Sequence, residues 1–494
     1  MLPFKQIPSN IRVPLFYAEV DNSQANSGVL NQRALIIGQI TSSGVAAANT
    51  PIISQGVADA KTQGGPGSQL ALMLEWYRKR DSFGEVWLLP LADDGAGVAA
   101  SGSINFTSAA TAPGTLSFYI AGTRVQMAVT ATQTAAQLAT ALAAAVNLLT
   151  DLPVTAAVDG TTTSKVNFTA KNKGAAGNDI DLRLNYGGAA AGEVTPTGLA
   201  ATIVAMASGA TNPVLTTALA NLGDQAFDFI VCPYTDTTSL NALKTFLADD
   251  TGRWSWNNQI YGHVFGAYSG TLGNLTTFGT GRNDQHASIM GKYDSPTPSW
   301  LWAANVAGAA AASIRVDPAL PLQTLALDVL APPVASRFAL TDRNTLLFDG
   351  ISTFAVSDDG TVRIENLITT YQKNAFSQPD DSYLQVETMF TLMAVLRFLK
   401  TRITSKFARV KLAADGTRFG AGSAIVTPNI IRADQIAAFK ELEQQGLVQN
   451  SEAFAAGLIV QQNAQNPNRV DVLWPGALIN QLRIFALLAQ FRLK

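Results

Sequence analysis

Residues 482–493 read Leu-Arg-Ile-Phe-Ala-Leu-Leu-Ala-Gln-Phe-Arg-Leu, and residues 11–20 read Ile-Arg-Val-Pro-Leu-Phe-Tyr-Ala-Glu-Val. Chain termini are usually polar and frayed, whereas these two are apolar and have the composition of β-strands. An apolar terminal strand either closes a sheet of its own molecule or adds to an exposed sheet edge of a neighbour. The choice between these arrangements decides whether the chain is self-contained or is one subunit of an assembly.

The composition limits the kinds of partner that the chain can have. Its 494 residues suffice for two to four domains, and only 14% of them are charged, against about a quarter in typical soluble domains. A surface of small and uncharged polar residues suits large close-packed contacts, because few charges must be desolvated. The net charge of −2 gives no electrostatic reason to expect nucleic acid, and the longest weakly polar runs, 198–210 and 303–314, are too short to cross a bilayer. We therefore expect neither direct nucleic-acid binding nor membrane insertion.

Strands and helices alternate in two separate parts of the chain. Arg33–Ile40 is a predicted buried strand, Ser68 caps a predicted helix that ends near Arg80, and Glu85–Pro90 is a second strand. The same alternation returns after residue 213 and continues to residue 314. This pattern favours an α/β layer with a partly parallel sheet. Residues 31–93 and 208–345 are therefore predicted to form one discontinuous α/β core domain.

The segment between these parts has a different character. Residues 101–164 contain only three charged side chains, and short runs rich in Thr and Val surround one helix. That helix begins with a capping box made by Thr134 and Gln137. The sequence predicts an inserted β-rich domain over residues 94–207, and we expect it to face outward.

The last part of the chain mixes helices and strands without regular alternation. An alternating strand at 360–370 precedes a long helix that Ser382 and Gln385 are expected to cap, and a shorter helix follows at 433–445. Two strand candidates, 457–461 and 469–474, come next. The sequence therefore predicts a multidomain α+β and α/β fold, with a C-terminal α+β domain at 346–480 and terminal arms at 1–30 and 481–494.

The residues most often used in catalysis are few and scattered. His263 and His286 are the only histidines, and neither belongs to a metal-ligand pattern. Cys232 stands at the end of a predicted buried strand, and the sequence has no signature of a base or an oxyanion hole to accompany it. A buried core thiol is therefore the better interpretation. The glycine-rich stretch Gln63–Ser68 lacks the lysine of a phosphate-binding loop. We expect no catalytic, cofactor-binding or metal-binding residues, and no cofactor.

One run of positive charge stands out. No acidic residue occurs between Glu387 and Asp415, whereas six basic residues fall within fifteen positions: Arg397, Lys400, Arg402, Lys406, Arg409 and Lys411. These residues either place cations near a helix C-terminus, with their stems covering apolar surface, or form a basic face for an acidic protein partner. The sequence leaves both interpretations open, although six positive charges without acidic partners would repel one another.

Several stretches, taken in order, show a family resemblance. They are 7–14 (Ile-Pro-Ser-Asn-Ile-Arg-Val-Pro) with 15–22 (Leu-Phe-Tyr-Ala-Glu-Val-Asp-Asn), 35–38 (Leu-Ile-Ile-Gly), 49–51 (Asn-Thr-Pro), 64–68 (Gly-Gly-Pro-Gly-Ser), 169–179 and 368–371 (Ile-Thr-Thr-Tyr). Their order along essentially the whole chain resembles the Mu-like contractile bacteriophage tail sheath family. The resemblance implies a structural virion subunit that assembles in the host cytoplasm and is not an enzyme.

The resemblance also implies how such a subunit works. Sheath subunits form hexameric rings that stack helically around a tail tube, and contraction drives the tube through the host envelope for genome delivery. The implied partners are further copies of the chain, the tail tube protein, and the baseplate and tail terminator proteins. The basic run Arg397–Lys411 is the candidate for facing the tube.

The terminal arms of such subunits join small sheets in neighbouring subunits, and the C-terminal domain's sheet is completed in this way. By resemblance, the arm residues are Val13, Leu15, Tyr17, Leu482, Ile484, Ala486 and Leu488, and the residues of the host strands are Leu458, Val460, Val470 and Val472.

Two other functions fit parts of the pattern. An α/β enzyme with an appended β domain would have a deep pocket with converging polar groups at the carboxyl ends of its parallel strands. A shell, capsid or surface-layer subunit would share the low charge and the β-rich insert. Microscopy of the purified protein distinguishes them, since a sheath forms tubes with a central bore, a shell forms sheets or closed particles, and an enzyme stays dispersed.

Overall fold

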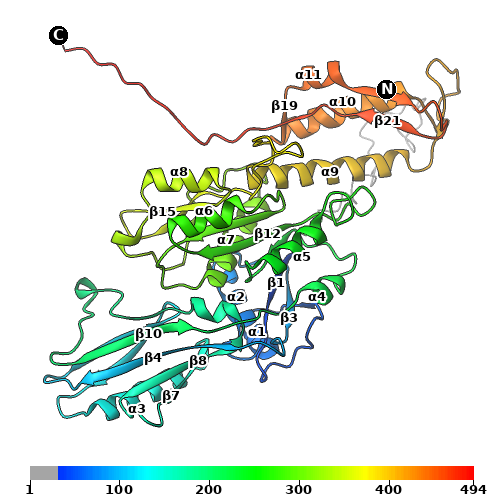
Figure 1. The fold of residues 1–494 in the computed structure, drawn as a ribbon. Helices are drawn as coiled ribbons and strands as arrows, with labels where there is room; N and C mark the ends of the chain where they lie inside the picture. The colour runs from blue at the N-terminus through cyan, green and yellow to red at the C-terminus, as the bar shows by residue number, and fades with distance from the viewer. Residues whose placement is uncertain (1–31, 494) are drawn as a thin grey trace, which may run out of the picture. The chain divides into compact units, whose positions relative to one another are not determined.

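A computed structural model describes residues 32–493 (Figure 1). The predicted N-terminal arm, with Val13, Leu15 and Tyr17, lies outside the described residues. The described chain forms two compact units, a larger one made of residues 32–391 and 480–493 and a smaller one made of residues 392–479. Within the described residues, no helix combines the length and the apolar composition that crossing a bilayer requires.

A six-stranded sheet forms the centre of the larger unit. Its strand order is β13-β12-β11-β1-β3-β2, and all neighbours are parallel except β2, which runs antiparallel to β3. The strands are β1 (Ala34–Gln39), β2 (Ile52–Ile53), β3 (Val86–Leu91), β11 (Phe229–Val231), β12 (His263–Ser269) and β13 (Ala287–Lys292). The predicted partly parallel sheet, built from two separate stretches of the chain, is confirmed.

Helices cover both faces of this sheet. Leu35 and Ile37 of β1 belong to an apolar cluster with residues of α4 (Thr216–Ala220), α5 (Thr237–Leu247) and α6 (Leu272–Thr280). Helices α2 (Gln69–Arg78) and α7 (Ser299–Ile314) pack against each other, and both contact the sheet. Helix α1 (Val57–Gly64) packs on α2. The hydroxyl of Ser68 accepts a hydrogen bond from the Ala71 amide at 3.2 Å, so the predicted cap of α2 is confirmed.

The segment 94–207 is rich in β-structure, as the sequence predicts (cyan to green in Figure 1). One sheet has the order β10-β4-β8-β7 and the other β6-β5-β9, and Thr134 and Gln137 form the expected capping box of α3 (Ala135–Leu148). The strands are β4 (Ala99–Ser108), β5 (Gly114–Ile120), β6 (Thr123–Val129), β7 (Val154–Val158), β8 (Lys165–Lys173), β9 (Leu182–Leu184) and β10 (Ala200–Ala207). Two 3₁₀ turns connect these strands: η1 (Ala175–Asp179) lies between β8 and β9, and η2 (Ala189–Ala191) lies between β9 and β10.

A small sheet continues the larger unit beyond residue 320. It has the order β14-β16-β15, with β14 (Ala326–Leu327), β15 (Thr353–Val356) and β16 (Val362–Asn366), and it accompanies α8 (Leu340–Phe348) and the turn η3 (Val334–Ser336). Ser352 forms an isolated β-bridge with Met290 of β13, and the ring of Phe390 stacks on Phe229 with centroids 5.0 Å apart. These contacts bind the chain up to residue 391 to the core. The compact units consequently divide at residues 391 and 392, whereas the sequence places the start of a C-terminal domain at residue 346.

The long predicted helix is α9 (Val386–Phe407), which passes from the larger unit into the smaller one. The expected cap at Ser382 is wrong, because the Ser382 hydroxyl donates to the Asp380 carboxylate at 3.1 Å in a separate turn before the helix. The smaller unit contains β17 (Lys411–Leu412), β18 (Ile425–Val426), α10 (Pro428–Gln444), β19 (Val448–Gln449), α11 (Ser451–Gly457), β20 (Ile459–Gln462), β21 (Val470–Leu473) and β22 (Ala477–Leu478). Its core includes Phe439, which stacks on Phe454 with centroids 3.9 Å apart.

Candidate assembly surfaces

The carboxyl end of β1 is the place where an open α/β sheet usually binds a ligand, because the neighbouring strands β11 and β3 lie on opposite sides of it. Here the inserted segment occupies that position. Gln39 donates to Asp93 Oδ1 and to the Lys173 carbonyl, both at 2.7 Å, and Asn172 donates to the Ile40 carbonyl at 2.9 Å. The cavity left there measures about 20 Å³, the size of one water molecule. The deep pocket that the enzyme alternative requires at this edge is filled by protein.

The histidines and the cysteine are packed into the larger unit. His263 is buried, its Nε2 lies 2.8 Å from Ser288 Oγ, and burial lowers its pKa to about 3, so the ring is neutral. His286 contacts Asp249 Oδ1 at 2.7 Å and stacks on Trp254. Burial raises the pKa of the Cys232 thiol to about 12, which keeps it protonated. Within residues 32–493, no group of His, Cys, Asp and Glu side chains has the arrangement of a metal site.

The C-terminal arm pairs with no strand among residues 32–493. Residues 480–493 form neither helix nor strand in the described structure, and the predicted arm residues Leu482, Ile484, Ala486 and Leu488 are all exposed. The exposed fraction is 83% for Ile484 and 84% for both Leu488 and Phe491. Soluble monomers rarely display such a continuous apolar segment, which usually marks a surface that binds another protein.

The arm is nevertheless attached to its own subunit at one point. Arg483 Nη2 lies 2.6 Å from Glu387 Oε2, and the Glu387 side chain in the first turn of α9 is completely buried. The other oxygen of Glu387 accepts the Leu322 amide at 2.6 Å, and Gln323 donates to the Leu482 carbonyl at 3.2 Å. The sequence does not predict this pair, although an arginine inside an apolar arm is a signal that it needs a partner. The arm is thus held at residues 482 and 483 and exposed from residue 484 onward.

The predicted host strands form a hairpin. β20 and β21 pair antiparallel from Ile459 opposite Leu473 to Gln462 opposite Val470, and no third strand among residues 32–493 joins them. Leu458 is buried just before β20, Val460 and Val470 are half-buried, and Val472 is exposed. Arg432 of α10 donates to the Leu458 carbonyl at 3.3 Å, so the hairpin is fastened to a helix of the same unit. A two-stranded sheet of this kind has edges that can accept a further strand.

The six basic residues do not act alike. Arg402 and Lys406 have acidic partners within the smaller unit: Arg402 pairs with Asp434 at 3.0 Å and with Glu441 at 2.7 Å, and Lys406 pairs with Asp434 at 2.7 Å. The acids come from α10, which follows in the sequence but packs beside α9, so no local pattern reveals them. Lys400, Arg409 and Lys411 are exposed and form no ion pair within residues 32–493, and Arg397 is half-buried. The candidate basic face is therefore reduced mainly to these three exposed side chains.

Comparison with known proteins gives consistent matches along the chain. The family model described as phage tail sheath protein central domain matches residues 208–370, and the model described as phage tail sheath C-terminal domain matches residues 378–492. The Mu-like prophage FluMu tail sheath protein of Haemophilus influenzae is 43% identical over 492 residues, which cover 99% of each chain.

Solved structures of similar proteins share much lower identity. The sheath tail protein of Desulfitobacterium hafniense is 14% identical with a TM-score of 0.47, and the match covers 95% of this chain and all of that one. The helical sheath of the anti-feeding prophage in its contracted state is 11% identical with a TM-score of 0.46, and the match covers 98% of this chain and all of that one.

Proposed function

The chain belongs to the phage tail sheath family, and from this premise we propose that it polymerises as stacked hexameric rings around a tail tube and contracts to drive the tube through the host envelope. As a member of this family, the chain is a structural component of a phage tail. We place it in the virion after assembly in the host cytoplasm. Its partners would be further copies of itself along the polymer, the tube protein inside it, and the baseplate and tail terminator proteins at its two ends.

The observation that carries the proposal is the exposed apolar arm. Six large apolar side chains of residues 484–493 are at least 77% exposed: Ile484, Phe485, Leu487, Leu488, Phe491 and Leu493. Burying one such side chain completely is worth about 1.5–3 kcal/mol, and each strand-to-strand hydrogen bond adds roughly 1 kcal/mol net. Pairing of the arm with another subunit would therefore release enough free energy to tether the two subunits while their bodies move.

We assign the acceptor to the hairpin β20–β21 of another subunit, with Leu458, Val460, Val470 and Val472 as its apolar residues. The alternating apolar residues of the arm can place one row of side chains on the hairpin's packed face. The N-terminal segment with Val13, Leu15 and Tyr17 would supply a second donated strand. Because a donated strand can keep one edge exposed, Pro14 is compatible with this role.

The exposed basic residues supply a candidate contact with the tube. Lys400, Arg409 and Lys411, with Arg397 nearby in sequence, would meet an acidic surface of the tube protein. Arg402 and Lys406 are engaged by Asp434, so their main role is to hold α10 against α9.

Removal of Ile484–Lys494 tests the proposal without disturbing the Arg483–Glu387 pair. The truncated protein should remain folded and monomeric, and electron microscopy should show no tubes. A finer version uses two double variants. The test variant carries both Ile484→Ser and Leu488→Ser, and the matched control carries both Ala489→Ser and Gln490→Ser. Tubes that form normally from the truncated chain would overturn the arm assignment.

A further inference from the structure

The inserted segment is joined to the core in a way that would permit its removal. Val98 and Ala210 exchange two backbone hydrogen bonds, at 3.0 and 3.1 Å, so the ends of the segment lie side by side. An insert with adjacent ends can be a detachable decoration of the molecule. Its polar contacts with the core indicate a different role.

One contact is made by Asn172 at the end of β8. Its Oδ1 accepts the Gln69 amide, the first of helix α2, at 2.9 Å, and its Nδ2 donates to the Ile40 carbonyl at 2.9 Å. Helix amides in the first turn have no partner within the helix, so a side chain from elsewhere must satisfy them. Asn172 therefore joins the end of the central strand β1 to the start of α2.

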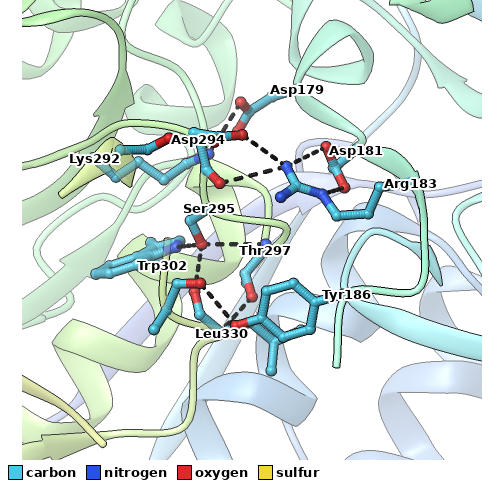
Figure 2. Close-up of polar contacts among 12 residues, drawn as sticks. Asp179, Asp181, Arg183, Tyr186, Lys292, Asp294, Ser295, Thr297, Trp302 and Leu330 are labelled. Carbon is cyan, nitrogen blue, oxygen red and sulfur yellow. Dashed lines mark hydrogen bonds and ion pairs between the residues drawn. The ribbon is translucent and has the colours of Figure 1, made fainter. Parts of the chain in front are cut away.

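The second contact is made by Asp179 at the start of α7 (Figure 2). The residue before α7 is Pro298, which offers no capping side chain, and the first turn of α7 contains no acidic residue. Asp179 Oδ2 accepts the Ser299 amide, and its Oδ1 lies 3.2 Å from Lys292 Nζ. The Lys292 side chain is only 2% exposed, so Asp179 also balances a buried positive charge.

Neighbouring residues strengthen the same junction. Arg183 of β9 binds Asp181 and reaches Asp294 Oδ1 in the core at 3.0 Å, as Figure 2 shows. The hydroxyl of Tyr186 donates to the Ala331 carbonyl at 2.7 Å. The insert is thus fastened to the loop between β13 and α7 through Arg183, and to the segment after β14 through Tyr186.

We propose that the inserted domain is an internal plug of the core, which it completes by capping α2 with Asn172 and α7 with Asp179, so that insert and core fold and move as one body. The plug occupies the edge of the parallel sheet where other α/β proteins bind ligands. In any rearrangement of the subunit, the insert would keep its position relative to the sheet. This inference does not depend on the arm assignment.

Point variants test the two caps in the full-length chain. Asp179→Asn keeps the shape of the side chain but leaves Lys292 without its counter-charge, and Asn172→Ala removes both hydrogen bonds. Each variant should lower the midpoint of thermal unfolding by about 2 °C or more and speed amide exchange at the start of α7 or α2. The control Asp358→Asn removes an exposed carboxylate of the same unit and should change neither. Variants that match this control would overturn the proposal.

The unfolding behaviour of the whole domain provides a second test. Exchange measured by mass spectrometry along a denaturant series should show peptides of β4, β8 and α7 opening together. Replacing residues 99–209 by Gly-Ser between Val98 and Ala210 should leave a chain with an exposed sheet edge that does not reach the native fold. The proposal would be contradicted if the insert and the core opened separately. It would also be contradicted if the chain without residues 99–209 kept the unfolding midpoint of the core.

Discussion

Arg483 at the base of the C-terminal arm lies 2.6 Å from Glu387, whose side chain is completely buried in the first turn of α9. The surroundings of the two side chains differ. Arg483 belongs to a mostly exposed segment without helix or strand, whereas Glu387 lies in a helix and also accepts the Leu322 amide. The pair therefore fixes where the exposed part of the arm begins.

This difference predicts unequal effects of removing the two partners. Arg483→Ala leaves the buried Glu387 side chain without its counter-charge and should lower the free energy of unfolding by about 3 kcal/mol. Glu387→Gln keeps an oxygen for Leu322 and should cost about 1 kcal/mol. Urea unfolding measures both changes. Equal losses, or a larger loss for Glu387→Gln, would show that the pair does not hold the arm in this way.

The pH dependence of the smaller unit should reflect Asp434. Burial opposes its ionisation, but hydrogen bonds from Arg402 and Lys406 outweigh burial and hold the pKa of Asp434 below its ordinary value of 3.8. The stabilisation is therefore complete above pH 3.8 and is lost as the pH falls through the lower folded-state pKa. Asp434→Asn should be less stable than the natural protein at pH 7 by about 2 kcal/mol, and this gap should narrow toward pH 2. Amide exchange of α10 peptides at the two pH values measures it, and a constant gap would contradict the assignment.

Charge reversal separates the two kinds of basic residue. Replacing Lys400, Arg409 and Lys411 together by Glu should leave thermal unfolding nearly unchanged, because none of them forms an ion pair within residues 32–493, and should weaken assembly on the tube protein. Arg402→Glu should instead destabilise the fold, because it places a third carboxylate beside Asp434 and Glu441. Co-sedimentation with tube protein, together with thermal unfolding, measures both effects. Undiminished co-sedimentation of the triple variant would remove these residues from the tube contact.

Cys232 should be inert in the native protein. Burial raises the pKa of its thiol to about 12 and keeps reagents from it. A thiol-reactive dye should label less than a tenth of the chains at pH 8 and nearly all of them in concentrated urea. Rapid labelling of the native protein would show that the core around β11 opens easily.

Local sequence patterns predict much of the fold, because the strongest of them need no distant partner. The apolar run 33–40 became β1, the alanine-rich run 299–314 became α7, and Thr134 with Gln137 formed the capping box of α3. Strands β7 and β10 were not anticipated, since their short runs of small residues become strands through pairing with β8 and β4.

Contacts between distant residues account for what the sequence could not show. Nothing near Arg402 in the chain reveals Asp434, and nothing near Glu387 reveals Arg483, 96 positions away. Ser382 fits a capping pattern, yet Asp380 binds its hydroxyl first. Asn172 and Asp179 lie in a conspicuously polar, glycine-containing stretch, but only the folded chain shows that they cap helices of the core.

Crosslinking between subunits tests the central claim most directly. Chains carrying only Leu488→Cys are mixed with chains carrying only Val472→Cys, assembled, and treated with a short bismaleimide, while the buried Cys232 stays unreactive. The account predicts a covalent product of one chain of each kind in the assembled tubes and none when either variant is treated alone. Tubes that assemble fully and yield no such product would contradict the donation of the C-terminal arm to the hairpin β20–β21 of another subunit.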